Sequence, residues 1–167
     1  VAEELRIPLE RIQVEIWNTD AIPFDSGVAG SRATRINTIV AYEAAQETKR
    51  ELLRLAAREL DWPEAGLTFV GDEIRRTDQE AGIRWSDLLA RTGTVVTGRA
   101  HIEERGRSHI TSFAVQVAEV SVDPETGEVK LLRFTTAHDV GQIVNPIGDQ
   151  GQIEGPIMQG IGYALTE

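Results

Sequence analysis

A helical period that runs from residue 34 to residue 60 constrains this chain more than any other feature of its sequence. Apolar residues recur there mostly at spacings of three and four, so one stripe of an α-helix would carry them into a core. The stripe consists of Ile36, Ile39, Val40, Ala44, Ala45, Leu52, Leu55, Ala56 and Leu60. Because an Asp-Trp-Pro sequence at residues 61–63 opposes further helix, we expect one long helix that ends near Leu60.

Period-two alternation of apolar and polar residues predicts strands before and after the long helix. We expect these strands at residues 12–17, 67–74, 94–103, 110–122 and 130–137. A Pro-Glu-Thr-Gly sequence at residues 124–127 supplies the turn of a hairpin between the last two strands. A short helix is expected at residues 85–89, with Ser86 or Asp87 as its cap, and a second helix is expected after residue 150.

Helices and strands do not alternate regularly along the chain, which is typical of the α+β class. The expected fold is α+β, with a mixed, largely antiparallel sheet, one long helix and a C-terminal glycine-rich helix. Both ends look like interrupted helices, because residues 1–5 lack a start signal and residues 161–167 lack a stop signal. We therefore expect residues 1–167 to be an excised segment of a larger protein.

The composition excludes several classes of function. There are 27 acidic residues against 17 basic ones, and no Lys/Arg-rich run with interleaved aromatic residues, so nucleic acid is not an expected partner. The chain contains no cysteine and cannot by itself hold an iron-sulfur cluster or a thiolate-bound metal. Its apolar runs are far shorter than the roughly 20 residues of a membrane span, so we expect no membrane contact and a cytoplasmic location.

The first candidate site is a small-residue segment that links a predicted strand to the long helix. It reads Asp-Ser-Gly-Val-Ala-Gly-Ser-Arg-Ala-Thr over residues 25–34. Small side chains let a ligand reach the backbone, and the free amides at a helix N-terminus favour an anion such as phosphate. A plain loop capped by Ser31 or Thr34 explains the same pattern equally well. The pattern matches neither the phosphate-binding loop nor the dinucleotide fingerprint.

The second candidate is a glycine-rich segment at residues 139–162. Glycines are unfavourable inside a helix, so their clustering indicates that a ligand or a neighbouring element approaches the backbone closely. The glycines are Gly148, Gly151, Gly155, Gly160 and Gly162. Gln152 and Gln159 lie two helical turns apart, and their neutral amides can donate to a ligand or accept from it. From pattern alone, a glycine-rich helix packed against a neighbour is the somewhat better explanation.

Nothing in the sequence suggests a nucleophile or a metal bound by protein side chains. His101 and His109 lie in polar surroundings and His138 precedes a loop, and no pair of histidines has metal-ligand spacing. Acid pairs such as Glu103 and Glu104 are expected to be solvated. There is no Ser/His/Asp or Cys/His arrangement, so we assign no catalytic residue and no metal ligand to this chain.

Taken together, the order and spacing of the motifs resemble those of the molybdenum hydroxylase family, which includes xanthine dehydrogenase, aldehyde oxidase and the large subunit of aerobic carbon monoxide dehydrogenase. The resemblance covers nearly the whole chain. Its motifs are Val-Ala-Glu-Glu-Leu at 1–5, Asn-Thr-Asp at 18–20, Ala-Gly-Ser-Arg at 29–32, Val-Asp-Pro-Glu-Thr-Gly at 122–127, Asp-Val-Gly at 139–141, Asn-Pro at 145–146, Gly-Gln-Ile-Glu-Gly at 151–155 and Gln-Gly-Ile-Gly at 159–162. The chain departs from the family pattern at Asn18, Val28 and Pro156.

The resemblance implies where a molybdenum-molybdopterin cofactor would bind. The implied cofactor-binding residues are Val28, Ala29, Gly30, Ser31, Thr34 and Gln152. In the family the cofactor's own dithiolene holds the metal, which agrees with the lack of Cys and His clusters. The family's catalytic glutamate lies in a Gly-Glu motif beyond the match to Glu167. We therefore expect residues 1–167 to form a partial molybdenum-cofactor-binding domain that is inactive by itself.

For the intact protein, the resemblance implies an oxidoreductase that hydroxylates an aldehyde or an N-heterocycle with oxygen from water. The cofactor would occur with or without a dinucleotide extension, and iron-sulfur clusters and FAD on other domains or subunits would take the electrons. Expected partners are the remainder of the large subunit, those redox domains or subunits and a small-molecule substrate. Two alternatives stay open: a non-catalytic relative or interaction module with no cofactor, and a phosphate-ligand domain that uses the loop at residues 26–31.

Overall fold

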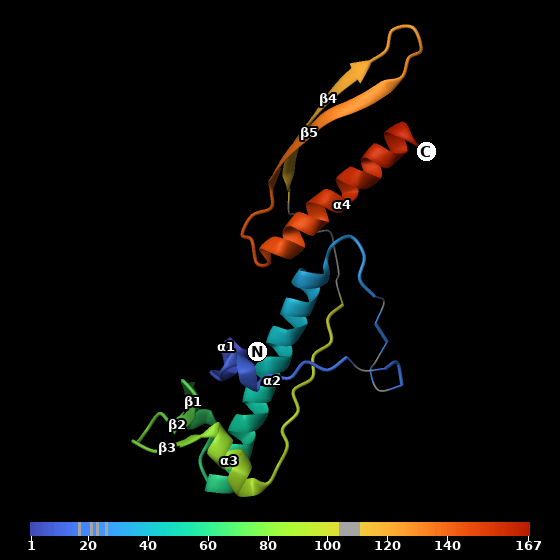
Figure 1. Ribbon diagram of the computed structural model, residues 1–167. Helices are drawn as coiled ribbons and strands as arrows, with labels where there is room; N and C mark the ends of the chain where they lie inside the picture. Colours follow the sequence, from blue (N-terminus) through green and yellow to red (C-terminus); the bar gives the residue numbers. More distant parts are fainter. Residues whose placement is uncertain (17, 21, 23, 26, 104–110) are drawn as a thin grey trace. The chain divides into compact units, whose positions relative to one another are not determined.

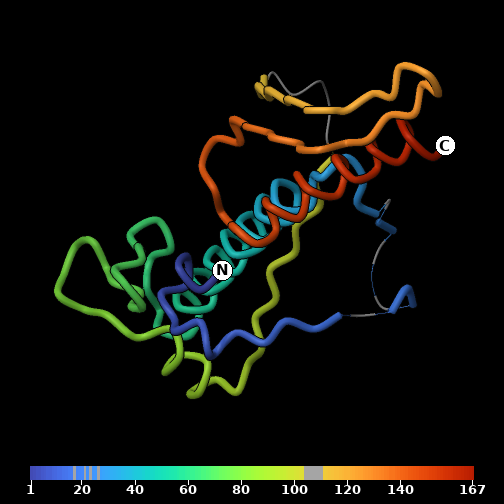
Figure 2. Tube along the Cα trace, turned by 45° about the horizontal axis from the view of Figure 1, so that its top comes forward, coloured from blue at the N-terminus to red at the C-terminus, as the bar shows by residue number. Residues whose placement is uncertain are grey.

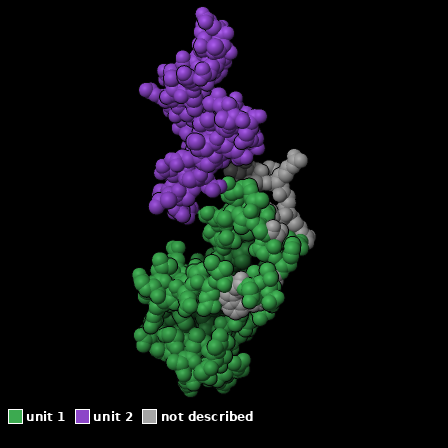
Figure 3. Space-filling model, turned by 45° about the vertical axis from the view of Figure 1, so that its right-hand side comes forward, with its two compact units in different colours: residues 1–104 green, residues 105–167 purple. Residues whose placement is uncertain are grey.

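The computed structural model describes residues 1–16, 18–20, 22, 24, 25, 27–103 and 111–167 (Figure 1). The chain forms two compact units, residues 1–104 and residues 105–167 (Figure 3). Some residues that enter the sequence-based predictions lie outside the described residues, namely Trp17, Pro23, Ser26, Glu104, His109 and Ile110. Each unit has its own secondary structure.

The first unit is built on helix α2, which spans Ala33–Leu60 and confirms the predicted long helix. It ends where expected, because Asp61 adopts a left-handed conformation with a φ of 53° and its amide bonds back to the carbonyl oxygen of Ala57. The predicted stripe is buried at Ala45, near the middle of the helix, and at Leu52, Leu55 and Ala56 in its C-terminal half. Ile39 stays 43% exposed, because the sheet and helix α3 cover only the C-terminal half (Figure 1).

A three-stranded antiparallel sheet follows α2 in the order β1-β2-β3, with β1 at Leu67–Val70, β2 at Glu73–Arg76 and β3 at Gly82–Arg84. The single strand predicted over residues 67–74 is wrong. Gly71 has a φ of 63° and allows a tight turn, which folds the segment back so that Val70 pairs with Glu73.

Helix α3 spans Trp85–Thr92 and is longer than the predicted short helix. Its N-cap is Arg84, which makes no side-chain cap bond, so the predicted cap by Ser86 or Asp87 is wrong. The Asp87 carboxylate accepts instead from Nε of Arg84 at 3.0 Å. Arg84 is extended because it is the last residue of strand β3, and the helix therefore starts at the next residue, Trp85.

The core of the first unit lies where α2, the sheet and α3 meet. Its buried members are Leu52, Leu55, Ala56, Leu67, Ile74 and Leu88. Two short 3-10 turns, η1 at Leu9–Arg11 and η2 at Glu64–Gly66, lie outside this core. The short helix α1, at Ala2–Leu5, is joined to the unit by Trp85, whose Nε1 donates to the carbonyl oxygen of Leu5 at 3.2 Å.

Two segments predicted as strands are extended but pair with no strand among the described residues, so both predictions are wrong. Within residues 12–16, Val14 is 86% exposed and Ile16 is 100% exposed. Without a partner strand, the alternation of apolar and polar residues does not form one buried face of a sheet. Residues 94–103 run beside α2 instead (Figures 1 and 2). A Cβ atom added at Gly98 would lie 2.6 Å from the amide nitrogen of Thr48, so the segment's backbone lies directly on the helix.

The second unit contains a long antiparallel hairpin, with β4 at Phe113–Val122 and β5 at Val129–Asp139. The predicted turn is confirmed: the Gly127 amide donates to the carbonyl oxygen of Asp123 at 2.8 Å, and the Asp123 amide donates to that of Glu128 at 2.9 Å. A register shift between Glu119 and Val120 marks a bulge in the ladder.

Helix α4 spans Pro146–Leu165 and begins earlier than predicted. Asn145 is the N-cap, and its Oδ1 accepts from the Gly148 amide at 3.1 Å, while Pro146 is suited to the first turn because it needs no amide partner there. The helix continues through Pro156 as one element, although a proline inside a helix removes one backbone hydrogen bond. With helices and antiparallel sheets in both units, the α+β class is confirmed.

Candidate functional site

The loop before α2 has a backbone that few residue types tolerate. Gly27, Gly30 and Ser31 have φ angles of 76°, 61° and 55°, all in the left-handed region. Two hydrogen bonds hold the loop at its ends. The Asp25 carboxylate accepts from the Gly27 amide at 2.6 Å, and Nη2 of Arg32 donates to the carbonyl oxygen of Gly27 at 3.2 Å. Asp25 and Arg32 were not predicted as site residues, although both lie in the motif.

The residues between Gly27 and Arg32 are exposed. The side chain of Val28 is 60% exposed, and Ala29, Gly30 and Ser31 are also exposed. A Cβ atom added at Gly30 would meet nothing within 4 Å. The backbone of this loop is therefore accessible to a ligand, as the sequence predicted, and no side chain at Gly30 covers it.

Helix α2 begins directly after the loop. Its N-cap is Arg32, whose own side chain makes no cap bond. Thr34 lies in the first turn, where backbone amides have no partner within the helix and the positive end of the helix dipole favours an anion.

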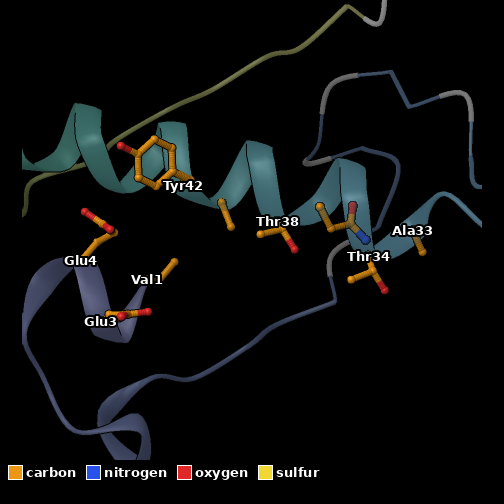
Figure 4. Close-up of a pocket in the computed structure, with 9 residues that line it drawn as sticks. Val1, Glu3, Glu4, Ala33, Thr34, Thr38 and Tyr42 are labelled. Carbon is orange, nitrogen blue, oxygen red and sulfur yellow. The ribbon is translucent and has the colours of Figure 1, made fainter. Parts of the chain in front are cut away.

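Thr34 also lines an open groove of about 540 Å³ beside α1 and the N-terminal half of α2 (Figure 4). Figure 4 shows Thr34, Thr38 and Tyr42 along α2, with Glu3 and Glu4 on α1. The complete lining is Val1, Glu3, Glu4, Ala33, Thr34, Asn37, Thr38, Ala41 and Tyr42. This groove was not predicted from the sequence, although its polar residues at 34, 37 and 38 have helical spacing.

The charge of Glu4 in this groove is compensated by α2. Nε2 of Gln46 donates to Oε2 of Glu4 at 2.6 Å, and Nζ of Lys49 lies 3.7 Å from the same oxygen. Nζ of Lys49 also lies 5.3 Å from the centre of the Phe69 ring. These contacts fasten α1 to α2, so Glu4 serves as a structural wall of the groove.

The second predicted segment contains the loop between β5 and α4, and the first turns of α4. The Gly141 amide donates to Oδ1 of Asp139 at 3.1 Å, and Gly141 has a φ of 67°. Gln152 is exposed on α4. Nε2 of Gln159 donates to the Tyr163 hydroxyl oxygen at 3.5 Å, so this glutamine has a partner in its own helix. Asn145, the cap of α4, was not predicted as a functional residue.

The predicted cofactor-binding residues therefore fall into two groups. The structure brings five of them together at the start of α2, namely Val28, Ala29, Gly30, Ser31 and Thr34. Gln152 belongs to the other compact unit. Its role beside the first group stays a prediction.

Resolved shifts in acidity lie away from both segments. A hydrogen bond from Arg50 lowers the pKa of Glu47, and one from Arg76 lowers the pKa of Asp78. The backbone amides of Glu125 and Thr126 lower the pKa of Asp123 in the hairpin turn. These groups are tied to structural hydrogen bonds, which makes none of them a candidate for proton transfer.

The donors at the two segments suit an organic cofactor better than a bare metal ion. Within the described part of the chain, no group of three or more His, Cys, Asp or Glu side chains could hold a metal. The loop before α2 instead offers backbone amides and the Thr34 hydroxyl. A polar heterocycle with phosphate groups matches such donors.

The fold and the site define an α+β protein with an exposed loop of left-handed backbone before α2. Comparisons with known proteins give the family: residues 1–167 match the model of a molybdopterin cofactor-binding domain. The chain belongs to this family.

Curated relatives support the same assignment. The chain is 32% identical to the 6-hydroxypseudooxynicotine dehydrogenase complex subunit gamma of Paenarthrobacter nicotinovorans, and the match covers 100% of the chain and 22% of that protein. It is 29% identical to the carbon monoxide dehydrogenase large chain of Hydrogenophaga pseudoflava, over 100% of the chain and 22% of that protein. The chain thus spans about a fifth of the length of these relatives.

A solved structure shares the fold. The crystal structure of a Cu,Mo-CO dehydrogenase in its carbon monoxide reduced state matches with a TM-score of 0.61 and 27% sequence identity. That match covers 92% of this chain and 20% of the other.

Among the described residues, no helix combines the length and the hydropathy that crossing a membrane requires.

Proposed function

We propose that this chain is part of the molybdenum-cofactor-binding subunit of a hydroxylase-type oxidoreductase, one that oxidises an aldehyde or an N-heterocycle with water as the oxygen source. The observation that carries the proposal is the loop from Gly27 to Ser31. Three of its residues have left-handed backbone, residues 28–31 are exposed, and the loop leads directly into the N-terminus of α2. In a family of molybdopterin cofactor-binding domains, such a loop is suited to hold the cofactor.

Each predicted residue has a role that its chemistry allows. The backbone amides of Val28, Ala29, Gly30 and Ser31 would donate to oxygen atoms of the cofactor. The Thr34 hydroxyl can donate or accept at the first turn of α2, and the Gln152 amide can do both. When bound, the cofactor supplies the redox centre for hydroxylation of a substrate carbon. Val28 contributes through its backbone alone, because its side chain has no polar atom.

The rest of the machinery is proposed to lie outside residues 1–167. A catalytic glutamate would follow this segment in the chain, and iron-sulfur clusters and FAD would lie on other domains or subunits. A chain without them has neither the catalytic glutamate nor an electron acceptor, so the segment by itself would be inactive. The remainder of the large subunit is thus its first partner.

The proposal is tested on the intact parent subunit, expressed with sufficient molybdate. The measurement is the molybdenum content by mass spectrometry, together with the pterin content by fluorescence after oxidation. We expect both to be present in near-stoichiometric amounts. A purified parent subunit that contains neither molybdenum nor pterin would contradict the proposal and support the alternative, an interaction module with no cofactor.

A matched pair of glycine variants tests the loop itself. Gly30→Ala and Gly71→Ala place the same methyl group at φ angles of 61° and 63°, and neither added Cβ meets an atom within 4 Å. Their strain should therefore be similar, about 1 to 2 kcal/mol. We expect only Gly30→Ala to lower the molybdenum content, because only that methyl group would face the cofactor. Equal loss in both variants would show that the effect is stability alone.

A second pair tests Gln152. Gln152→Ala and Gln159→Ala remove the same amide from α4, and Gln159 already bonds within its own helix to Tyr163. We expect Gln152→Ala to weaken retention of the cofactor on dialysis, with Gln159→Ala close to the parent protein. A greater loss in Gln159→Ala would contradict the assignment of Gln152.

A further inference from the structure

The loop before α2 has a backbone conformation that one of its residues does not favour. Among the described residues, three that are not glycine have a positive φ, namely Arg6, Ser31 and Asp61. Arg6 and Asp61 are the C-caps of α1 and α2, where a left-handed residue is an ordinary way to end a helix. Ser31 comes before a helix, at a φ of 55°, so that reason does not apply to it. A left-handed serine costs free energy, and contacts of the loop must hold it in place.

Two side chains hold the same residue at the start of this loop. Oδ1 of Asp25 accepts from the Gly27 amide at 2.6 Å, and Nη2 of Arg32 donates to the Gly27 carbonyl oxygen at 3.2 Å. We call these two hydrogen bonds the Gly27 clamp. Both use backbone groups of Gly27, so neither occupies an amide of residues 28–31. The clamp therefore leaves to the cofactor the amides that the proposed function assigns to it.

The bond from Arg32 also sets the direction of the next amide. The carbonyl group of Gly27 and the N–H group of Val28 belong to one planar trans peptide unit, so they point in opposite directions. A guanidinium that holds the carbonyl oxygen on one side therefore turns the Val28 amide toward the other side. Because the side chain of Val28 has no polar atom, the direction of this amide decides what Val28 can bind.

Arg32 is itself fixed by the helix that it begins. It is the N-cap of α2, it is half-buried, and its carbonyl oxygen accepts from the Ile36 amide at 3.0 Å. From this position its side chain reaches back five residues to Gly27 and closes residues 28–31 into a ring. The buried core of the first unit lies between Leu52 and Leu88, so the ring is not part of it. The clamp can therefore order the loop without contributing to that core.

We infer that Asp25 and Arg32 are positioning residues for the cofactor, which act through Gly27 to hold the amides of residues 28–31 in the orientation that binds it. In this role neither side chain touches the cofactor. The inference rests on the proposed function, which supplies the cofactor. A loop that is ordered before binding loses less conformational freedom when the ligand arrives, so the clamp should strengthen retention of the cofactor.

A pair of Asp25 variants of the full-length subunit tests the clamp against a simple effect of charge. Asp25→Asn and Asp25→Ala remove the same negative charge, but only asparagine keeps an Oδ1 that can accept from the Gly27 amide. We expect Asp25→Ala to shorten the half-time of molybdenum and pterin loss on dialysis by about 2- to 10-fold. Asp25→Asn should stay close to the unmodified subunit. Equal half-times in the two variants overturn the inference.

A pair of Arg32 variants tests the other bond. Arg32→Lys keeps a long side chain with a donor for the Gly27 carbonyl oxygen, whereas Arg32→Met keeps the bulk without the donor. We expect Arg32→Lys to retain most of the cofactor and Arg32→Met to lose it about as fast as Asp25→Ala. Arg35→Met is the control, because it removes the same charge from the first turns of α2 and leaves the clamp in place. A loss in Arg35→Met as fast as in Arg32→Met overturns the inference.

Urea unfolding of the cofactor-free subunits separates positioning from stability. Because the clamp lies outside the core, we expect Asp25→Ala and Arg32→Met to unfold at the same urea concentration as the unmodified subunit. A lower midpoint in both variants would make the two residues merely structural and overturns the inference.

The unmodified subunit separates this inference from the proposed function. If it contains neither molybdenum nor pterin, the proposed function fails, and the positioning role fails with it. If it is loaded and the paired variants do not differ, the clamp alone is refuted.

Discussion

Replacing Gly98 by alanine should detach the segment at residues 94–103 from α2. The added Cβ would lie 2.6 Å from the amide nitrogen of Thr48 and would also overlap the carbonyl oxygen of Ala44 and the hydroxyl of Thr48. That hydroxyl cannot simply turn away, because it donates to the Ala44 carbonyl oxygen at 2.9 Å. Two of the three crowded atoms belong to the helix backbone, which does not yield locally.

The size of the effect follows from two opposing terms. Overpacking of this kind costs about 1 to 3 kcal/mol, while alanine restricts the unfolded chain and returns about 0.4 to 1 kcal/mol. We therefore expect the free energy of unfolding of the first unit to fall by about 1 to 2 kcal/mol. The assay is urea unfolding followed by tryptophan fluorescence, because Trp62 and Trp85 pack against the core.

A control variant isolates the contact with α2. Gly66→Ala adds the same methyl group in the same unit, but its nearest neighbours would be Oγ1 of Thr77 at 3.6 Å and Cγ of Pro63 at 3.8 Å, which are ordinary contacts. Gly66→Ala should be neutral or slightly stabilising. If Gly98→Ala is as stable as Gly66→Ala, the segment does not lie on α2, and the packing argument is refuted.

Three further predictions concern the core, a helix cap and a turn. Leu52→Ala removes a side chain that is 1% exposed and should cost about 2 to 5 kcal/mol in urea unfolding, whereas a loss below 1 kcal/mol would place Leu52 outside the core. Asn145→Ala removes the cap bond to Gly148 and should cost about 1 kcal/mol, seen as lower helix content by circular dichroism, while Asn145→Asp should keep most of it. The pKa of Asp123 is lowered in the folded state, so its contribution to stability is complete above its unfolded pKa of about 4 and is lost as the pH falls through the folded value. Asp123→Ala should therefore destabilise the hairpin at pH 7 and weaken its acid dependence; an unchanged acid profile by amide exchange would argue against this role.

Much of the fold could be predicted because its signals are local. The stripe of α2, the stop at residues 61–63 and the hairpin turn at residues 124–127 each depend on contacts within a few residues. The candidate loop at residues 28–31 was found for the same reason, since small residues before a helix already indicate an accessible backbone. The matching family was identified from the order of such local motifs along the chain.

Other features could not be predicted, because they depend on what lies beside each segment in space. Residues 94–103 alternate like a strand, yet their neighbour is a helix, and a helix cannot offer a ladder of hydrogen bonds. The groove at Thr34 forms only because α1, more than twenty residues earlier in the chain, is fastened to α2 through Glu4.

The sequence by itself determined the stop of α2, the hairpin turn at residues 124–127 and which loop exposes its backbone, because these follow from side-chain size, φ preference and periodicity. Only the tertiary structure decided which part of the α2 stripe is buried and that Gly98 lies against a helix. Burial is a property of pairs of segments, and a pattern in one segment does not specify its partner.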